Sequence, residues 1–324
     1  MKHLENGKEY PAPNEKRYIA AICALLRKSM EKEYAHRKML RRFHAKAIGL
    51  VEAEFSVEEL PESLQIGLFK GRRTLKAWVR FSNAAQNITA DYKRGVRGMA
   101  IKVLQVGEDP LQEDKMGQTQ DFVLTTNKFI FPGTVKKYLQ SLKGLFTNFL
   151  YLGVIFLNPF NWRGILTLVN AMIRVPDILE ATFYSATPYL FGEGKAVKWQ
   201  ARPLVPGTTK MPENPRPDFL THRLTEDLSK GEFSFGLFIQ QQENPVRQPI
   251  EDPNIEWTTP LIQVATLTIF QQSFDTTQRK QQAETMSFSP WHALPQHRPL
   301  GGINRVRKSV YEQLSRLRNE HNEK

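Results

Sequence analysis

Runs of strand-forming residues recur along most of the chain and constrain its fold more than any other feature. They lie at 78–81, 99–106, 121–125, 232–241 and 261–270. The last run is apolar on both faces, as in a strand at the centre of a barrel or sandwich. Proline-rich loops at 202–217, 244–253 and 289–299 separate the later elements. The pattern predicts a β-rich core of the barrel or sandwich kind.

Apolar residues at helical spacing mark both ends of the chain. They are Ile19, Ile22, Leu25, Leu26 and Met30 within residues 16–40, and Val306, Val310, Leu314 and Leu317 in the segment that begins at Asn304. Together with the strand runs, these helices predict an α+β fold. The chain of 324 residues has enough apolar mass for one core. We therefore expect a single domain over 1–324, with a loose N-terminal arm at 1–15.

The single cysteine, Cys23, excludes an intramolecular disulfide and any cysteine-cluster zinc or iron–sulfur site within one chain. The sequence starts with polar residues and shows no apolar segment of the secretory-signal type. The composition, 40% hydrophobic and 24% charged, is typical of a soluble globular protein. We therefore expect a cytoplasmic protein.

Lysine and arginine outnumber aspartate and glutamate by 45 to 33, so the chain favours anionic ligands or surfaces. The basic residues gather at 36–46, 70–76 and 305–318 rather than in one tail. A solvated basic face is one interpretation, and recognition of carboxylates or phosphates is the other. No motif interleaves basic residues with aromatic ones on one platform, so nucleic-acid binding is not predicted.

One segment, residues 141–184, is unusually apolar. Its run from 145 to 157 has about 13 residues, whereas a membrane-spanning helix needs roughly 20, so no transmembrane span is predicted. Two interpretations stay open. The segment is either a buried helical hairpin or an apolar surface that touches a membrane or admits a lipid, with Trp162 and Arg163 at its edge. In the second case the protein would be membrane-associated.

The seven histidines show no HxH or i,i+4 metal spacing, and the chain has no glycine-rich phosphate loop, HExxH or GxSxG sequence. His44 stands out through its neighbours. Five segments follow in order: R-R-F-H-A-K-A-I-G at 41–49, V-R-F-S at 79–82, R-G-M-A-I-K-V at 97–103, M-G-Q-T-Q-D-F-V at 116–123 and F-P at 131–132. This series resembles the haem catalases, which carry R-x-x-H-A-K-G, V-R-F-S, R-G-F-A-x-K-F, G-N-N-x-P-x-F-F and F-P.

The end of the chain extends the resemblance, which covers about residues 35–320. Catalases bind haem iron through a tyrosine in an R-x-x-x-Y segment, with another arginine seven residues after the tyrosine. Arg307, Tyr311 and Arg318 match that spacing. On a helix, Arg307 and Tyr311 share a face. A guanidinium and a ferric ion within reach would both favour the phenolate form of the tyrosine.

The resemblance implies a catalase-like antiparallel β-barrel with flanking helices and a buried haem b. It makes Tyr311 the axial ligand of the iron, with Arg307 beside it. It also assigns contacts with the haem propionates to Arg41, Arg80 and Arg318, because arginine forms charge-assisted, often bidentate bonds with carboxylates. Part of the basic excess would then serve anion recognition.

On the other face of the haem, the resemblance makes His44 the acid–base group, which would take a proton from peroxide and return one to the departing oxygen. Ser82 would orient His44, and Phe131 would flank the pocket. Gln118 would stand where catalases have an asparagine that donates to peroxide. The implied activity is that of a haem-dependent peroxidase or catalase-like enzyme that acts on a peroxide.

Three features depart from the catalase pattern. Gln118 is one methylene longer than the asparagine, and Phe43 precedes the histidine where catalases have a small aliphatic residue. The sequence also ends 13 residues after Tyr311, at 324, so we expect no C-terminal domain of the NADPH-associated kind. These departures point to the short catalase-related peroxidases, which include relatives like allene oxide synthase. The apolar segment favours organic or lipid hydroperoxides over hydrogen peroxide as substrates.

Two alternatives remain at this point. The same haem could rearrange a fatty acid hydroperoxide, as in a lyase or isomerase of the allene oxide synthase type. The chain could instead be a non-catalytic haem-binding protein or a peripheral membrane protein. The sequence does not choose the peroxide or the electron donor, and a homo-oligomer stays open.

Overall fold

The computed structural model describes residues 4–85, 87–130, 133–146 and 172–323, together with Gly153, Leu157, Trp162, Leu166 and Val169. Phe131, which the resemblance places beside the haem, lies outside these described residues. So does most of the apolar part of segment 141–184.

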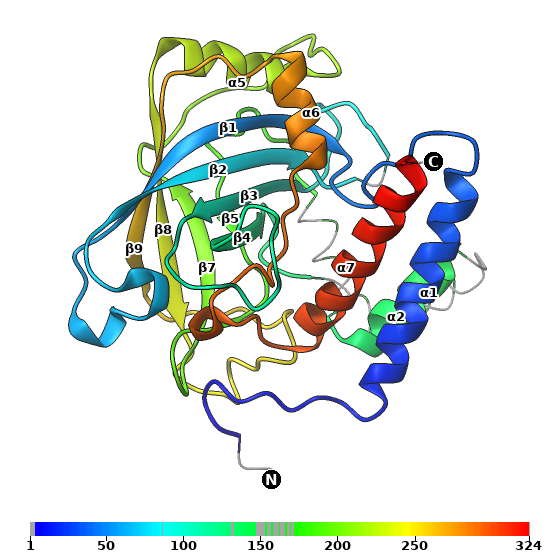
Figure 1. Cartoon of the computed structure of the whole chain (residues 1–324), viewed down its shortest axis with the longest axis vertical. Helices are drawn as coiled ribbons and strands as arrows, with labels where there is room; N and C mark the ends of the chain where they lie inside the picture. The colour runs from blue at the N-terminus through cyan, green and yellow to red at the C-terminus, as the bar shows by residue number, and fades with distance from the viewer. Residues whose placement is uncertain are drawn as a thin grey trace.

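An antiparallel β-barrel forms the centre of the described molecule (Figure 1). Its longer strands are β1 (Lys46–Val57), β2 (Thr74–Asn83), β3 (Arg97–Leu104), β4 (Thr119–Thr125), β7 (Ala196–Pro203), β8 (Phe233–Gln241) and β9 (Leu261–Ile269), and two short ones are β5 (Phe183–Tyr184) and β6 (Tyr189–Leu190). Neighbouring strands follow the order β5-β4-β3-β2-β1-β9-β8-β7-β6, and β5 also pairs with β7. That last pairing closes eight of the described strands, all except β6, into a ring.

Side chains alternate between the two faces of each strand, and those that point inward fill the barrel. In β1, Val51, Ala53 and Phe55 are buried, whereas Glu52 and Glu54 face solvent. Aromatic rings from different strands meet in this interior. Phe122 of β4 lies 5.8 Å from Phe55 and 5.1 Å from Trp199 of β7, measured between ring centroids. Such aromatic pairs contribute about 0.5–1.5 kcal/mol each beyond their buried area. The interior is therefore a packed core, and ligands must bind outside it.

Helices cover one side of the barrel. α1 (Glu15–Glu33), α2 (Val135–Phe146) and α7 (Gly302–Asn322) pack against one another, and α7 stands between the barrel and α1 in Figure 1. They share a core made of Ile22, Leu26, Met30, Leu139, Leu142, Val306, Val310 and Leu314. Two further helices, α5 (Phe219–Lys230) and α6 (Thr277–Thr285), contact β1. The predicted antiparallel barrel with flanking helices is confirmed.

The N-terminal residues are tied to the body of the molecule. Glu9 forms a 2.5 Å ion pair with Arg298 and a second ion pair with Arg305. The backbone N–H of Tyr10 donates to a carboxylate oxygen of Glu251 at 3.0 Å. The described part of the expected arm thus makes ion pairs and a hydrogen bond with the body of the molecule. Local sequence patterns do not reveal these ion pairs, because the partners of Glu9 lie nearly 300 residues away along the chain.

Few residues of the apolar segment 141–184 are described before Met172. Leu157, Leu166 and Val169 are largely exposed, and Leu157 retains 80% of its accessible surface. The interpretation as a buried hairpin does not hold at these positions. No described helix combines the length and apolar character that a membrane crossing requires.

Candidate functional site

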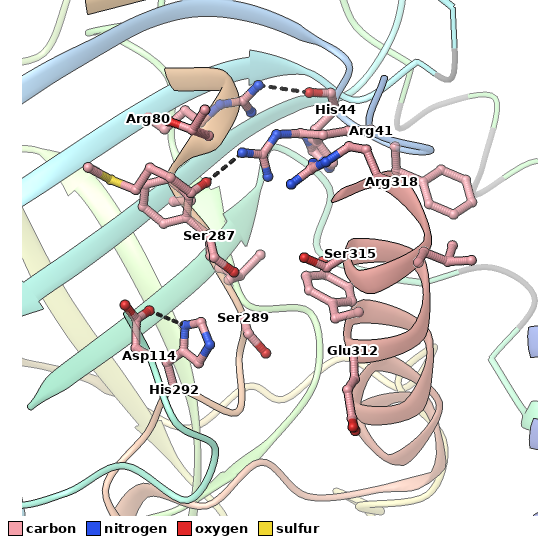
Figure 2. A pocket seen from close by; sticks show the side chains of 18 of the residues that line it. Arg41, His44, Arg80, Asp114, Ser287, Ser289, His292, Glu312, Ser315 and Arg318 are labelled. Atoms are coloured by element: carbon pink, nitrogen blue, oxygen red, sulfur yellow. Dashed lines mark hydrogen bonds and ion pairs between the residues drawn. The ribbon is translucent and has the colours of Figure 1, made fainter. Parts of the chain in front are cut away.

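A cavity of about 690 Å³ lies between the barrel and α7 (Figure 2). Ligand sites in proteins usually have roughly 300–1,000 Å³, so this cavity is large enough for a cofactor. Its walls come from the segment between α1 and β1, the ends of β2, β3 and β4, the loop before β4, the segment after α6, and one face of α7. Six residues predicted from the sequence line it: Arg41, His44, Arg80, Ser82, Tyr311 and Arg318.

The imidazole of His44 is fixed from the barrel side. Its Nδ1 lies 2.9 Å from Oγ of Ser82 on β2. Gly98 on β3 makes room for the ring, because a Cβ at this position would lie only 2.5 Å from Cε1 and Nδ1 of His44. Burial, together with the positive charges of Arg80, Arg307 and Arg41, lowers the pKa of His44 to about 3. The ring is therefore neutral at physiological pH.

The backbone at His44 adopts a left-handed conformation, with φ of 57°. Such a conformation costs a residue other than glycine roughly 1–2 kcal/mol, so its surroundings must hold it. Arg80 contributes by donating from Nη2 to the carbonyl oxygen of His44 at 3.0 Å. Nε of Arg80 also donates to the carbonyl oxygen of Ala283 at 3.1 Å, at the end of α6. Arg80 thus links β2, the His44 turn and α6.

Three guanidinium groups gather at one end of the cavity, as Figure 2 shows for Arg41, Arg80 and Arg318. Burial and the charges of Arg80 and Arg318 lower the pKa of Arg41 to about 9. Burial also lowers the pKa of Arg318, and Glu284 offsets that effect in part. The Glu284 carboxylate lies 3.6 Å from Arg80 and its side chain is 40% exposed. Positive charge therefore exceeds negative charge at this end.

Tyr311 and Arg307 lie one turn apart on α7, as predicted from their spacing. Tyr311 and His44 both line the cavity. Arg307 is not among the lining residues, and it donates to Oγ1 of Thr187 and Oδ1 of Asn304, each at 3.3 Å. Arg307 therefore braces α7 against the barrel instead of facing the cavity.

The structure does not bring Gln118 to the cavity. Its side chain is exposed and donates to Oδ1 of Asp109 at 3.2 Å. The role of peroxide donor is therefore not supported for this residue. Gln118 sits at the end of a loop that enters β4, and loop geometry, unlike strand position, does not follow from counting residues. Phe43, the bulky neighbour of His44, does line the cavity, as do Met116 and Asp114 from that same loop.

A second polar cluster borders the cavity, and sequence reasoning missed it. Lys102 of β3 lies 2.8 Å from Asp121 of β4 and also pairs with Asp114. Nδ1 of His292 lies 2.7 Å from Asp114 and 2.9 Å from Asp121. These carboxylates and the imidazole are close enough to hold a metal ion, but the Lys102 ammonium already serves as their cation. No motif signals the cluster, because its members come from three separate segments.

No protein-family model matches this chain, and no curated protein sequence matches it significantly. Solved structures do match. A fungal catalase superposes with a TM-score of 0.69 at 18% identity, over 98% of this chain and 65% of the catalase. Catalase A from Saccharomyces cerevisiae gives 0.68 at 16% identity, over 98% and 68%, and a bacterial catalase gives 0.67 at 17%, over 98% and 64%. The fold is therefore catalase-like, and the chain spans about two thirds of the length of these catalases.

The cavity fits the haem that the sequence resemblance implies. The Nε atom of Arg41 is buried without a hydrogen-bond partner, and an anionic group at this end would satisfy it. The two propionates of haem would also offset the repulsion among Arg41, Arg80 and Arg318. Tyr311 on α7 would hold the iron through its phenol oxygen, and His44 lines the same cavity from the barrel side.

Proposed function

We propose that this protein is a haem-dependent peroxidase that reduces organic or lipid hydroperoxides, and more slowly hydrogen peroxide. The observation that carries the proposal is one cavity with the neutral His44–Ser82 pair on the barrel side, Tyr311 on the α7 side and three clustered guanidiniums at one end. The catalase-like fold supports it, since the proteins with matching structures are themselves catalases.

When bound, haem would supply a redox-active iron at which the O–O bond of a peroxide can be cleaved. Arg41, Arg80 and Arg318 would hold its propionates, and Tyr311 would hold the iron. His44 would accept the proton of the peroxide at Nε2, because its ring is neutral and Ser82 already engages Nδ1. The same Nε2 would then return the proton to the departing oxygen.

The proposed preference for organic hydroperoxides rests on the lining of the cavity. Gln118 points away from it and cannot donate to a small peroxide there. Phe43 and Met116 add apolar surface instead. Each buried methylene of an acyl chain contributes about 0.8 kcal/mol, so a short apolar contact is enough to favour a longer substrate. Rearrangement of a fatty acid hydroperoxide would use the same residues without consuming an electron donor.

The first experiment is an absorption spectrum of the purified protein, before and after addition of haem, for the parent chain and Tyr311→Phe. We expect a high-spin ferric spectrum with phenolate character that is lost or changed in the variant. A parent chain that takes up no haem, or a variant with an unchanged spectrum, would contradict the proposed site.

The second experiment is steady-state kinetics with cumene hydroperoxide, linoleic acid hydroperoxide and hydrogen peroxide, with and without a phenolic electron donor. We expect the two organic substrates to give the higher kcat/KM and the donor to be consumed. His44→Ala should keep its haem and lose at least about 100-fold in turnover, the usual share of acid–base catalysis. His222→Ala, at an exposed histidine, is the matched control. Product formed without loss of donor would identify a rearrangement.

A further inference from the structure

Lys102, Asp114, Asp121 and His292 form a buried group at the end of the cavity away from the three arginines (Figure 2). The side chains of Lys102 and Asp121 are fully buried, and those of Asp114 and His292 are only 2% and 5% exposed. Asp114 and His292 nevertheless line the cavity. The group can therefore meet a bound molecule through this cavity.

The hydrogen bonds of His292 leave one ring nitrogen for the cavity. Every hydrogen bond and ion pair that the described residues make with this ring goes through Nδ1. In Figure 2, Asp114 stands on one side of the ring, and the opposite edge of the ring faces the space in front of α7. Carboxylates that accept from Nδ1–H fix the orientation of an imidazole and direct Nε2 outward.

Charge balance favours the cationic form of His292. Two buried carboxylates face one ammonium, that of Lys102, so the group is neutral only when the imidazole carries a proton. Burial by itself lowers the pKa of His292, but the hydrogen bonds to Asp114 and Asp121 outweigh it and raise the pKa above the ordinary value. Lys102 opposes this rise, and Glu312 of α7 lines the same cavity from the facing side.

The cavity thus holds two histidines whose surroundings shift their pKa values in opposite directions, downward for His44 and upward for His292. When their environments shift the pKa values of two titratable groups in opposite directions, one group can act as the base and the other as the acid. We propose that His292, oriented by Asp114 and Asp121, is a second proton-transfer site of the cavity that donates from Nε2. This inference rests on the proposed reduction of peroxides, which consumes protons.

The proposed step is a plain proton transfer. The Nε2–H bond breaks, its electron pair stays on Nε2, and the proton joins an oxygen of the substrate or of a water molecule in the cavity. The neutral ring then keeps its proton on Nδ1, where both carboxylates accept it. Proton uptake from water in the cavity restores the cation. Lys102 keeps the pair of carboxylates from being left without a counter-charge during the step.

The direct test is a histidine NMR titration of the full chain prepared without haem, with His292→Gln used to assign the signal. We expect the His292 signal to titrate above the ordinary histidine pKa of about 6.5. Asp114→Asn should lower that titration while the ring stays in place, because one of its two acceptors loses its charge. A His292 signal that titrates at or below 6.5, or that ignores Asp114→Asn, overturns the proposal. This readout does not depend on haem or on activity.

The second test is the pH profile of peroxide turnover in the haem-loaded protein. The parent should lose turnover as the pH rises through the His292 pKa, and Asp114→Asn should move that alkaline limb to lower pH. His292→Gln should turn over at least about 10-fold more slowly and lack the limb, whereas His222→Gln should match the parent. An unchanged rate and profile in haem-replete His292→Gln overturns the inference and leaves the proposed function standing. A parent chain without haem or peroxide turnover contradicts the proposed function itself.

Discussion

Nδ1 of His44 lies 2.9 Å from the hydroxyl oxygen of Ser82, and both side chains rest on a position where the adjoining strand has no side chain. That position is Gly98 of β3, which pairs directly with Ser82. A Cβ there would lie 2.5 Å from the His44 ring and 2.8 Å from the Ser82 hydroxyl. The geometry of the His44–Ser82 pair therefore depends on Gly98, which has no side chain and takes no part in proton transfer.

Gly98→Ala should displace the His44 ring and break its contact with Ser82. We expect the variant to bind haem and to lose at least about 10-fold in peroxide turnover, part of the share that positioned acid–base groups contribute. The measurement is turnover per bound haem. Gly231→Ala is the control, since a Cβ at Gly231 meets nothing within 4 Å. Equal turnover per haem in Gly98→Ala and the parent would show that the ring can shift without cost.

The left-handed backbone at His44 predicts different stabilities for two variants that both lack the imidazole. His44→Gly should be more stable than His44→Ala by about 0.5–1 kcal/mol, because alanine suffers the steric cost of φ near 57° and glycine does not. The greater entropy of unfolded glycine limits the difference. Urea unfolding of the haem-free variants measures it. An alanine variant as stable as the glycine variant would mean that the turn relaxes.

Arg318→Leu should change the stability of the haem-free protein and its affinity for haem in opposite directions. Removing one of three clustered guanidiniums relieves repulsion, so the melting temperature without haem should rise or stay level. Haem should dissociate faster, because one partner of the propionates is gone. Differential scanning fluorimetry and haem transfer to a scavenger protein measure the two effects. A lower melting temperature with unchanged haem retention is the opposite of what we expect. Arg27→Leu, at an exposed arginine, is the control.

His297 should make the protein less stable in mild acid. Its ring packs 5.3 Å from Phe69 and 5.9 Å from Trp199, and burial lowers its pKa to about 4. In the unfolded chain the His297 ring therefore binds a proton near pH 6.5, whereas in the folded chain it binds one only near pH 4. Between these values the ring should remove about 1.4 kcal/mol of stability for each unit of falling pH.

His297→Gln tests this acid effect, since its side-chain oxygen can still accept from the N–H of Leu68, which now bonds to Nε2 of His297 at 3.1 Å. Urea unfolding at pH 7, 6 and 5 should show a shallower loss of stability in His297→Gln than in the parent. His222→Gln, at an exposed histidine, should follow the parent. Parallel pH dependence in all three proteins would rule out the buried ring as the cause.

Local patterns in the sequence foresaw much of the barrel but not its longest strand. The five predicted runs correspond to β2, β3, β4, β8 and β9. β1 was missed because Glu52 and Glu54 interrupt it and Gly49 lies near its start. α6 was missed as well, since Ala283 is its only buried residue. Both elements are held by their neighbours rather than by their own apolar pattern.

The sequence by itself identified candidate haem-binding residues near both ends of the chain. The spacing of Arg307, Tyr311 and Arg318 lies within one helix, and helical geometry places such residues without long-range information. His44, just before β1, and Ser82, on β2, were identified through short motifs that resemble those of catalases. For His44 and Ser82 the structure supplies the distance between the two side chains. It also shows that Arg307 donates a hydrogen bond to Thr187.

Only the tertiary structure decided what else surrounds the cavity. It turned Gln118 outward, because a loop before β4 sets the direction of that side chain. It also joined Asp114, Asp121 and His292 around Lys102, although His292 lies 171 residues beyond Asp121 in the chain. Contacts of this range depend on how strands and loops meet across the barrel. Local periodicity in the sequence does not predict such long-range contacts.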